Sequence, residues 1–126
     1  IKPFVISHIT FSGDYDGELL FLFSKESAKI IIDNIFIDNP KHTRDDYLDA
    51  MSEFVNSIAG KLKSNIARIN QCIVFTLPYS SITLNDVIHK ELDQTFILSE
   101  FSSNDASYHV ALSSPIDFEI DVNVDI

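Results

Sequence analysis

The sequence predicts an α+β domain with a mostly antiparallel sheet and two main helices. Short apolar, β-branched runs are bounded by turn residues, as in strands, and two longer segments repeat apolar residues at helical spacing. Strand-like and helix-like segments come in clusters without regular strand–helix alternation, which favours α+β over a parallel βαβ sheet. With 126 residues, the chain is expected to form a single domain over residues 1–126.

A β-hairpin is predicted at the start of the chain, over about residues 4–24. The apolar runs PFVISHITF and GELLFLF are joined by GDYDG, in which Asp16-Gly17 is a strong turn signal. Glycine supplies the positive φ that tight turns need.

Two helices are predicted after the hairpin. Ser24 is a suitable N-cap for the first, whose apolar positions have helical spacing (Ala28, Ile31, Ile32 and Ile35), and which Pro40 ends. The second opens at Thr43, with Asp45 and Asp46 in a first turn that resembles a capping box. It is expected to run to about Asn70.

The long helix is predicted to be amphipathic. At about 100° per residue, its apolar side chains fall in one broad sector. They are Leu48, Met51, Phe54, Val55, Ile58, Leu62, Ile66 and Ile69.

The opposite side of this helix carries a polar stripe formed by Asp49, Glu53, Asn56 and Gly60. The first three fall within roughly 60° of one another. A solvated face is the simple interpretation, since every amphipathic helix has a polar side. Gly60 favours a functional one, because glycine inside a helix costs about 1 kcal/mol relative to alanine. Solvation does not explain that cost, whereas close approach of another backbone would.

The second half of the chain is predicted to add strands. QCIVFTLP (71–78) is expected to be a strand and SSITLNDVIHKELDQ (80–94) mostly loop. TFILSEF (95–101) and SYHVALSS (107–114) are predicted strands, with Asn104-Asp105 near the turn between them. Residues 116–126 alternate apolar and polar side chains, which predicts a half-buried antiparallel strand whose acids protect a sheet edge.

Composition narrows the class of protein. A 45% hydrophobic content excludes a disordered chain, and a net charge of −10 disfavours nucleic acids and anionic membranes as partners. A partner with a basic face would suit the chain better. The single cysteine, Cys72, the absence of a signal peptide and the lack of an apolar run of ~20 residues indicate a cytoplasmic protein without a membrane span. The start at Ile1 indicates that some upstream sequence is missing.

Other chemical sites are not predicted. The four histidines (His8, His42, His89 and His109) are scattered without metal-ligand spacing, and are expected to be ordinary surface or partly buried residues. DYDGE at 14–18 lacks the ligand pattern of a calcium loop. Cys72 lies in an apolar run and is expected to be a small core residue. The expected metal and cofactor content is none.

The motif Asp49-x-x-x-Glu53-x-x-Asn56, followed by SIAGKLKS with Gly60, resembles the signature helix of the CheC, CheX and FliY chemotaxis phosphatases. The segment 9–36 is similar to the family's hairpin and following helix, and TLPYSSIT occupies the place of a family strand. The resemblance spans roughly residues 5–113 and implies a CheC-like fold. One copy of the motif resembles CheX more than CheC, which has two. A helix that family members carry before the first strand is missing here.

The resemblance implies a phosphatase that hydrolyses the aspartyl phosphate of a CheY-like response regulator. Asn56 would position the attacking water, and Glu53 would pair with the regulator's active-site lysine. Asp49 would extend that contact, and Gly60 would give the partner room. The expected Mg²⁺ belongs to the regulator, so the chain needs no cofactor of its own.

Two alternatives and a question of assembly stay open at this point. The chain could be a non-catalytic docking or scaffold module of the same fold, or a fragment of a longer protein with a receiver domain upstream. The intact Glu53/Asn56 pair favours catalysis. The resemblance also implies a homodimer formed by strand exchange. The segment 116–126 either takes part in that pairing or completes the chain's own sheet.

Overall fold

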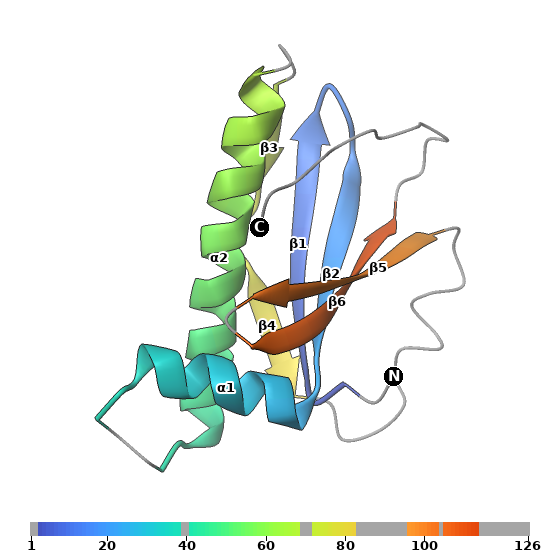
Figure 1. Ribbon diagram of the computed structural model, residues 1–126. Helices are drawn as coiled ribbons and strands as arrows, with labels where there is room; N and C mark the ends of the chain where they lie inside the picture. The colour runs from blue at the N-terminus through green and yellow to red at the C-terminus, as the bar shows by residue number, and fades with distance from the viewer. Residues whose placement is uncertain (1–2, 39–40, 69–71, 83–95, 104, 114–126) are drawn as a thin grey trace.

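The computed structural model describes residues 3–38, 41–68, 72–82, 96–103 and 105–113. It confirms the predicted α+β class, with two helices and an antiparallel sheet (Figure 1). The elements in chain order are β1 (Val5–Gly13), β2 (Gly17–Phe23), α1 (Lys25–Ile35), α2 (Arg44–Arg68), β3 (Ile73–Phe75), β4 (Tyr79–Ile82), β5 (Phe96–Ser103) and β6 (Ala106–Ser113).

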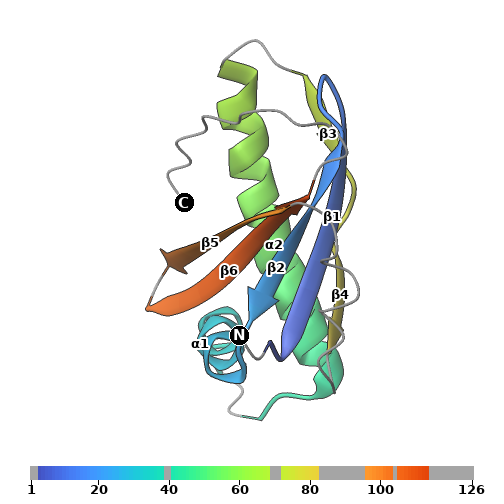
Figure 2. The same ribbon diagram turned by 90° about the vertical axis from the view of Figure 1, so that its right-hand side faces the viewer.

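The sheet has six strands in the order β3-β1-β2-β6-β5, and β4 also pairs with β1. β1 therefore has β2 on one side and the short strands β3 and β4 in succession on the other. α2 lies along β1, β3 and β4 on one face of the sheet, while α1 packs near β6 (Figures 1 and 2). This arrangement leaves the outer side of α2 turned away from the sheet.

The first hairpin is confirmed, but its special glycine is Gly13. Gly13 has φ 128°, and a Cβ there would collide with the carbonyl oxygen of Cys72. Gly17, predicted to supply the positive φ, instead begins β2 without one. The backbone N–H of Asp14 donates to the Cys72 carbonyl at 2.9 Å. This hydrogen bond holds the turn of the first hairpin against the residue that precedes β3.

The prediction that Cys72 is a core residue is wrong, because its side chain is exposed. Cys72 precedes β3, and its backbone makes the contacts: its N–H donates to the Asp14 carboxylate at 2.5 Å. The strand predicted over 71–78 is limited to Ile73–Phe75.

The predicted loop over 80–94 is also partly wrong, because Tyr79–Ile82 forms β4. The family resemblance, which placed a strand in TLPYSSIT (76–83), is confirmed there. This segment pairs with β1 from Val5↔Ile82 to His8↔Tyr79. Its own polar sequence does not indicate a strand, because the hydrogen-bond partners that stabilise it lie far away in the chain. The rest of the predicted loop and the predicted strand at 116–126 lie outside the described residues. β5 and β6 confirm the last hairpin, with Asp105 at φ 68° in its turn.

Both helices begin where their sequences predict. Ser24 Oγ accepts the N–H of Ser27 at 3.1 Å and caps α1. Thr43 and Asp46 form a reciprocal capping box at the start of α2, with distances of 2.9 and 3.1 Å. α2 ends at Arg68, and its predicted continuation to Asn70 lies outside the described residues.

The core forms between the sheet and α2. Met51, Val55 and Ile58 of α2 are buried, as the predicted apolar sector requires. They adjoin a group of aromatic rings from the sheet and from α2, in which Tyr108 contacts its neighbours at centroid distances of 5.4 to 6.5 Å (Phe21, Phe23, Phe54 and Phe101). The buried phenol has no hydrogen-bond partner within the described parts of the chain.

Tyr108→Phe is expected to change how the free energy of unfolding responds to alkaline pH, with little effect at neutral pH. Burial raises the pKa of Tyr108 to about 12. An unfolded tyrosine ionises near pH 10, so this group's contribution to the unfolding free energy is fully present below pH 10 and is lost as pH rises toward 12. Removing a hydroxyl without a partner should cost little at neutral pH.

The measurement is urea unfolding of both proteins at pH 7 and from pH 9 to 12. The wild-type protein should lose stability relative to Tyr108→Phe above pH 10. A constant difference between the two proteins across that range would contradict a buried, neutral phenol.

Candidate functional site on the outer face of α2

The four predicted site residues lie together on the exposed side of α2. Asp49, Glu53, Asn56 and Gly60 are all exposed, whereas the intervening Met51, Val55 and Ile58 face the core. The structure therefore confirms that they share one face, which we call the polar stripe. It does not test their predicted roles.

The polar side chains of this stripe are available to a partner. Within the described residues, Asp49, Glu53 and Asn56 make no side-chain hydrogen bond or ion pair. This differs from Asp46, one turn earlier, whose carboxylate is engaged by the Thr43 N–H. A carboxylate and an amide one turn apart can thus meet an incoming molecule without first breaking an internal contact.

A partly buried chain of hydroxyl groups connects α2 to the sheet next to Glu53. Ser52 Oγ of α2 lies 2.6 Å from Ser80 Oγ of β4, which lies 2.6 Å from Ser7 Oγ of β1. Ser7 is completely buried, so this chain replaces the solvent that its hydroxyl would otherwise bind. The contact fixes the position of α2 along the two strands, and hence that of its exposed side.

The hydroxyl chain was not predicted from the sequence. The available signal is the polar Ser7 in phase with the inward apolar residues Val5, Ile9 and Phe11 of the same strand. Its partners are 45 and 73 residues away along the chain, and only the fold brings them together.

Gly60 has open space where a side chain would be. A Cβ at this position would meet no atom of the described residues within 4 Å outside the helix's own backbone. Packing within the chain therefore does not require this glycine, although it sits in the interior of α2. The helix surface at Gly60 therefore has room for a side chain that the sequence does not supply.

The histidines are paired singly with carboxylates and do not converge. His8 contacts Glu18, and His109 lies 3.8 Å from Glu100. His42 Nε2 lies 2.9 Å from Asp33, and His89 is outside the described residues. His42 and then Lys29, which bond to Asp33, hold the pKa of that carboxyl below its ordinary value.

The segment predicted not to bind calcium uses two of its carboxylates to accept backbone N–H groups. Asp14 accepts the N–H of Cys72, and Asp16 accepts the N–H of Gly13 at 3.3 Å. Among the described residues, no three His, Cys, Asp or Glu side chains are grouped as metal ligands. Nor does that part of the chain include a helix long and apolar enough to cross a membrane.

The chain matches the family model described as "Chemotaxis phosphatase CheX" over residues 5–102. The chain belongs to the CheX family. The resemblance inferred from the helix motif and the hairpin is thereby confirmed, and the matched region contains the whole of α2. No curated protein matches the chain.

Solved structures of CheX-family proteins share this fold. CheX from Desulfovibrio desulfuricans superimposes with a TM-score of 0.73 at 18% identity, covering 90% of this chain and 76% of that one. CheX from Vibrio vulnificus gives 0.72 at 19% identity, covering 90% and 79%. The CheX of a CheX–CheY complex with BeF₃ and Mg²⁺ from Borrelia burgdorferi gives 0.64 at 14% identity, covering 86% and 74%. The predicted CheC-like architecture is therefore confirmed.

Proposed function

We propose that this chain hydrolyses the aspartyl phosphate of a CheY-like response regulator. The family to which it belongs is described as a chemotaxis phosphatase, and a structural relative forms a complex with CheY. The observation that carries the proposal is that Glu53 and Asn56 lie one turn apart on the exposed side of α2. Neither side chain makes a hydrogen bond or ion pair with the described residues.

The proposed chemistry needs little from the phosphatase. Water attacks the phosphorus atom, the bond between phosphorus and the aspartate oxygen breaks, and inorganic phosphate leaves a regenerated carboxylate. An acyl phosphate is already reactive, so the main requirement is to place the water in line. The regulator would hold the Mg²⁺ that neutralises the phosphoryl oxygens.

Asn56 is proposed to position the attacking water. Its amide both accepts and donates hydrogen bonds without titrating, so it can orient one water over a wide pH range. Its place one turn after Glu53 on a regular helix puts the two side chains on the same side.

Glu53 is proposed to anchor the helix in the regulator's active site. Its carboxylate would form a charge-assisted hydrogen bond with the regulator's lysine, and Asp49, one turn earlier, would extend the same contact. The pairing would place Asn56 opposite the phosphoryl group.

The test uses the chain in catalytic amounts. A phosphorylated regulator from the same organism is mixed with one-fiftieth its concentration of the chain, and phosphate release is followed. Phosphate release faster than that of the regulator alone, with an excess of more than one phosphate per chain, supports an enzyme. Stable binding of the regulator without faster phosphate loss would support a docking or scaffold module instead.

A homodimer in the cytoplasm is also part of the proposal. A response regulator acts in the cytoplasm, and the alternating segment 116–126 has the pattern of a pairing strand, although it lies outside the described residues. Sedimentation equilibrium of the chain with and without residues 116–126 would test the second point. Monomers in both samples would contradict the dimer.

Gly60→Ala is expected to stabilise the chain and to slow dephosphorylation. Alanine in place of an unstrained helical glycine should raise the unfolding free energy by about 0.4–1 kcal/mol, and no described atom would clash with the new methyl group. If a regulator loop approaches the helix backbone here, the same methyl group would obstruct it.

Melting temperature and phosphate release are measured on the same variant. Ala67 is a reference position, because it is also exposed on the same side of α2 and already carries the methyl group that Gly60→Ala would add. A more stable Gly60→Ala with full activity would show that the partner needs no clearance there.

A further inference from the structure

The last turns of α2 carry an unusual concentration of positive charge for this chain. Only nine lysines and arginines oppose nineteen acids, yet Lys61, Lys63 and Arg68 fall within eight residues. The acids of α2 lie in its first half (Asp45, Asp46, Asp49 and Glu53). The helix that bears the polar stripe is therefore negative in one half and positive in the other.

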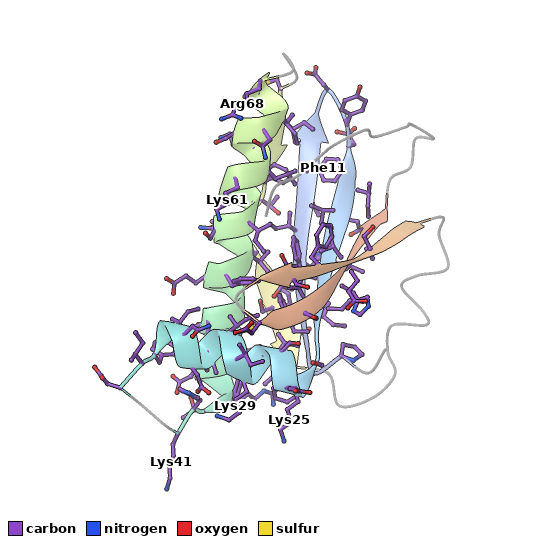
Figure 3. The ribbon with its side chains drawn as sticks, viewed as in Figure 1. Phe11, Lys25, Lys29, Lys41, Lys61 and Arg68 are labelled. Carbon is purple, nitrogen blue, oxygen red and sulfur yellow. The ribbon has the colours of Figure 1, made fainter. Side chains whose placement is uncertain are left out.

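These three cations are exposed and have no ion pair or hydrogen bond with any described residue. By contrast, Lys29 pairs with Asp33 at 3.0 Å. Figure 3 shows Lys61 and Arg68 on the outer side of α2, at the end of the molecule opposite Lys25, Lys29 and Lys41.

Lys61 and Arg68 lie about 60–80° around the helix axis from Glu53, further along the exposed part of α2. Their separation of seven residues corresponds to two turns, so both project to nearly the same side. With a rise of 1.5 Å per residue, Lys61 lies about 12 Å and Arg68 about 22 Å along the axis from Glu53. A protein domain lying along the outer side of α2 can span that distance.

The helix dipole does not explain both cations. Positive charge is favoured beside the last carbonyl groups of a helix, which accounts for Arg68 in the final turn. That effect falls off within one turn, and Lys61 lies seven residues earlier. Lys61 therefore has no such structural explanation.

We propose that Lys61 and Arg68 form a second contact with the response regulator and recognise carboxylates on its surface. The inference rests on the proposed function, because it assumes that the regulator lies over Glu53 and Asn56. Its lysine would face Glu53 while its acids face the far half of α2. A regulator in the reverse orientation would bring like charges together at both ends.

The second contact would also select among response regulators. Receivers that share the same catalytic lysine would differ in whether a carboxylate lies about 12–22 Å from it. A receiver with a lysine or arginine at that distance would be rejected by repulsion. The preferred substrate is thus a regulator with an acidic patch at that distance from its phosphorylation site.

The test is the double variant Lys61→Glu/Arg68→Glu, assayed as the whole chain on the phosphorylated regulator. We expect KM to rise about tenfold at low ionic strength with kcat unchanged, because the water-positioning group is intact. The increase should shrink markedly at 1 M salt, where exposed charges are screened. Lys41→Glu, a single charge reversal at the opposite end, should leave KM unaltered.

Lys61→Gln/Arg68→Gln, which removes the charges without adding new ones, should give a smaller rise in KM. Equal KM values for the double variant, the Lys41→Glu control and the wild type would overturn the second contact while leaving the proposed function intact. If the wild type releases no phosphate, titration with the BeF₃-activated regulator replaces KM by Kd. No binding by the wild type would then refute both proposals.

Discussion

Asn56→Ala is expected to lower the rate of regulator dephosphorylation by about 10²-fold or more. Asn56 is exposed and its side chain makes no hydrogen bond with the described residues, so truncating it should leave the fold unchanged. Affinity for the regulator should change little, because Glu53 rather than Asn56 is proposed to anchor it. The measurement is kcat from phosphate release, with affinity for the BeF₃-activated regulator taken in parallel.

A matched control lies in the next position. Ser57 is polar and exposed on the same helix, and Ser57→Ala should retain nearly full activity. An active Asn56→Ala, or equal losses in the two variants, would refute water positioning by the amide. Loss of binding in Asn56→Ala would instead assign this residue to docking.

Glu53→Ala is expected to weaken regulator binding by roughly thirtyfold, which corresponds to about 2 kcal/mol. The carboxylate has no internal partner among the described residues, so the loss would come from the complex and not from the fold. Because the proposed pair is ionic, the dependence of affinity on salt should also become less steep. The measurement is regulator affinity at two ionic strengths.

Two control variants show whether the loss of affinity in Glu53→Ala comes from the charge at this position, from the shape of the side chain, or from the change in net charge. Glu53→Gln keeps the size of the side chain but removes its charge. It should reproduce most of the loss of affinity seen in Glu53→Ala. Glu26→Ala removes an exposed glutamate from α1 and should change affinity little. An unchanged affinity and salt dependence in Glu53→Ala would show that Glu53 is a solvated surface residue.

The features that the sequence predicted are those with local causes. Ser24 and Thr43 cap helices because their hydroxyl groups reach backbone N–H groups three residues ahead. The orientation of α2 follows from 3.6 residues per turn, so Met51 and Val55 point inward without reference to the rest of the chain.

The features that the sequence did not predict depend on distant partners. β4 has too little apolar character to be recognised alone and exists because β1 has an edge to pair with. Gly13 rather than Gly17 carries the positive φ because the Cys72 carbonyl comes close to it, 59 residues later. Exposure of Cys72 has the same origin, since its backbone meets Asp14.

The candidate site was predictable in part. Helical geometry alone placed Asp49, Glu53, Asn56 and Gly60 on one side of a helix, and the structure agrees. Geometry could not assign chemistry to them, and their roles came from the resemblance to the CheX family. The hydroxyl chain through Ser52 could not be found this way, because its members meet only in the folded chain.

The most direct test of the account is to map the regulator's footprint on the chain by NMR. The ¹⁵N-labelled chain is titrated with a BeF₃-activated response regulator, and amide shifts are assigned along α2. We expect the largest shift changes on the outer side of α2, from Asp49 through Gly60 to Lys61. Without BeF₃ activation of the regulator, these changes should weaken strongly or disappear. Unchanged α2 amides, with the shifts concentrated on the strands of the sheet, would contradict it.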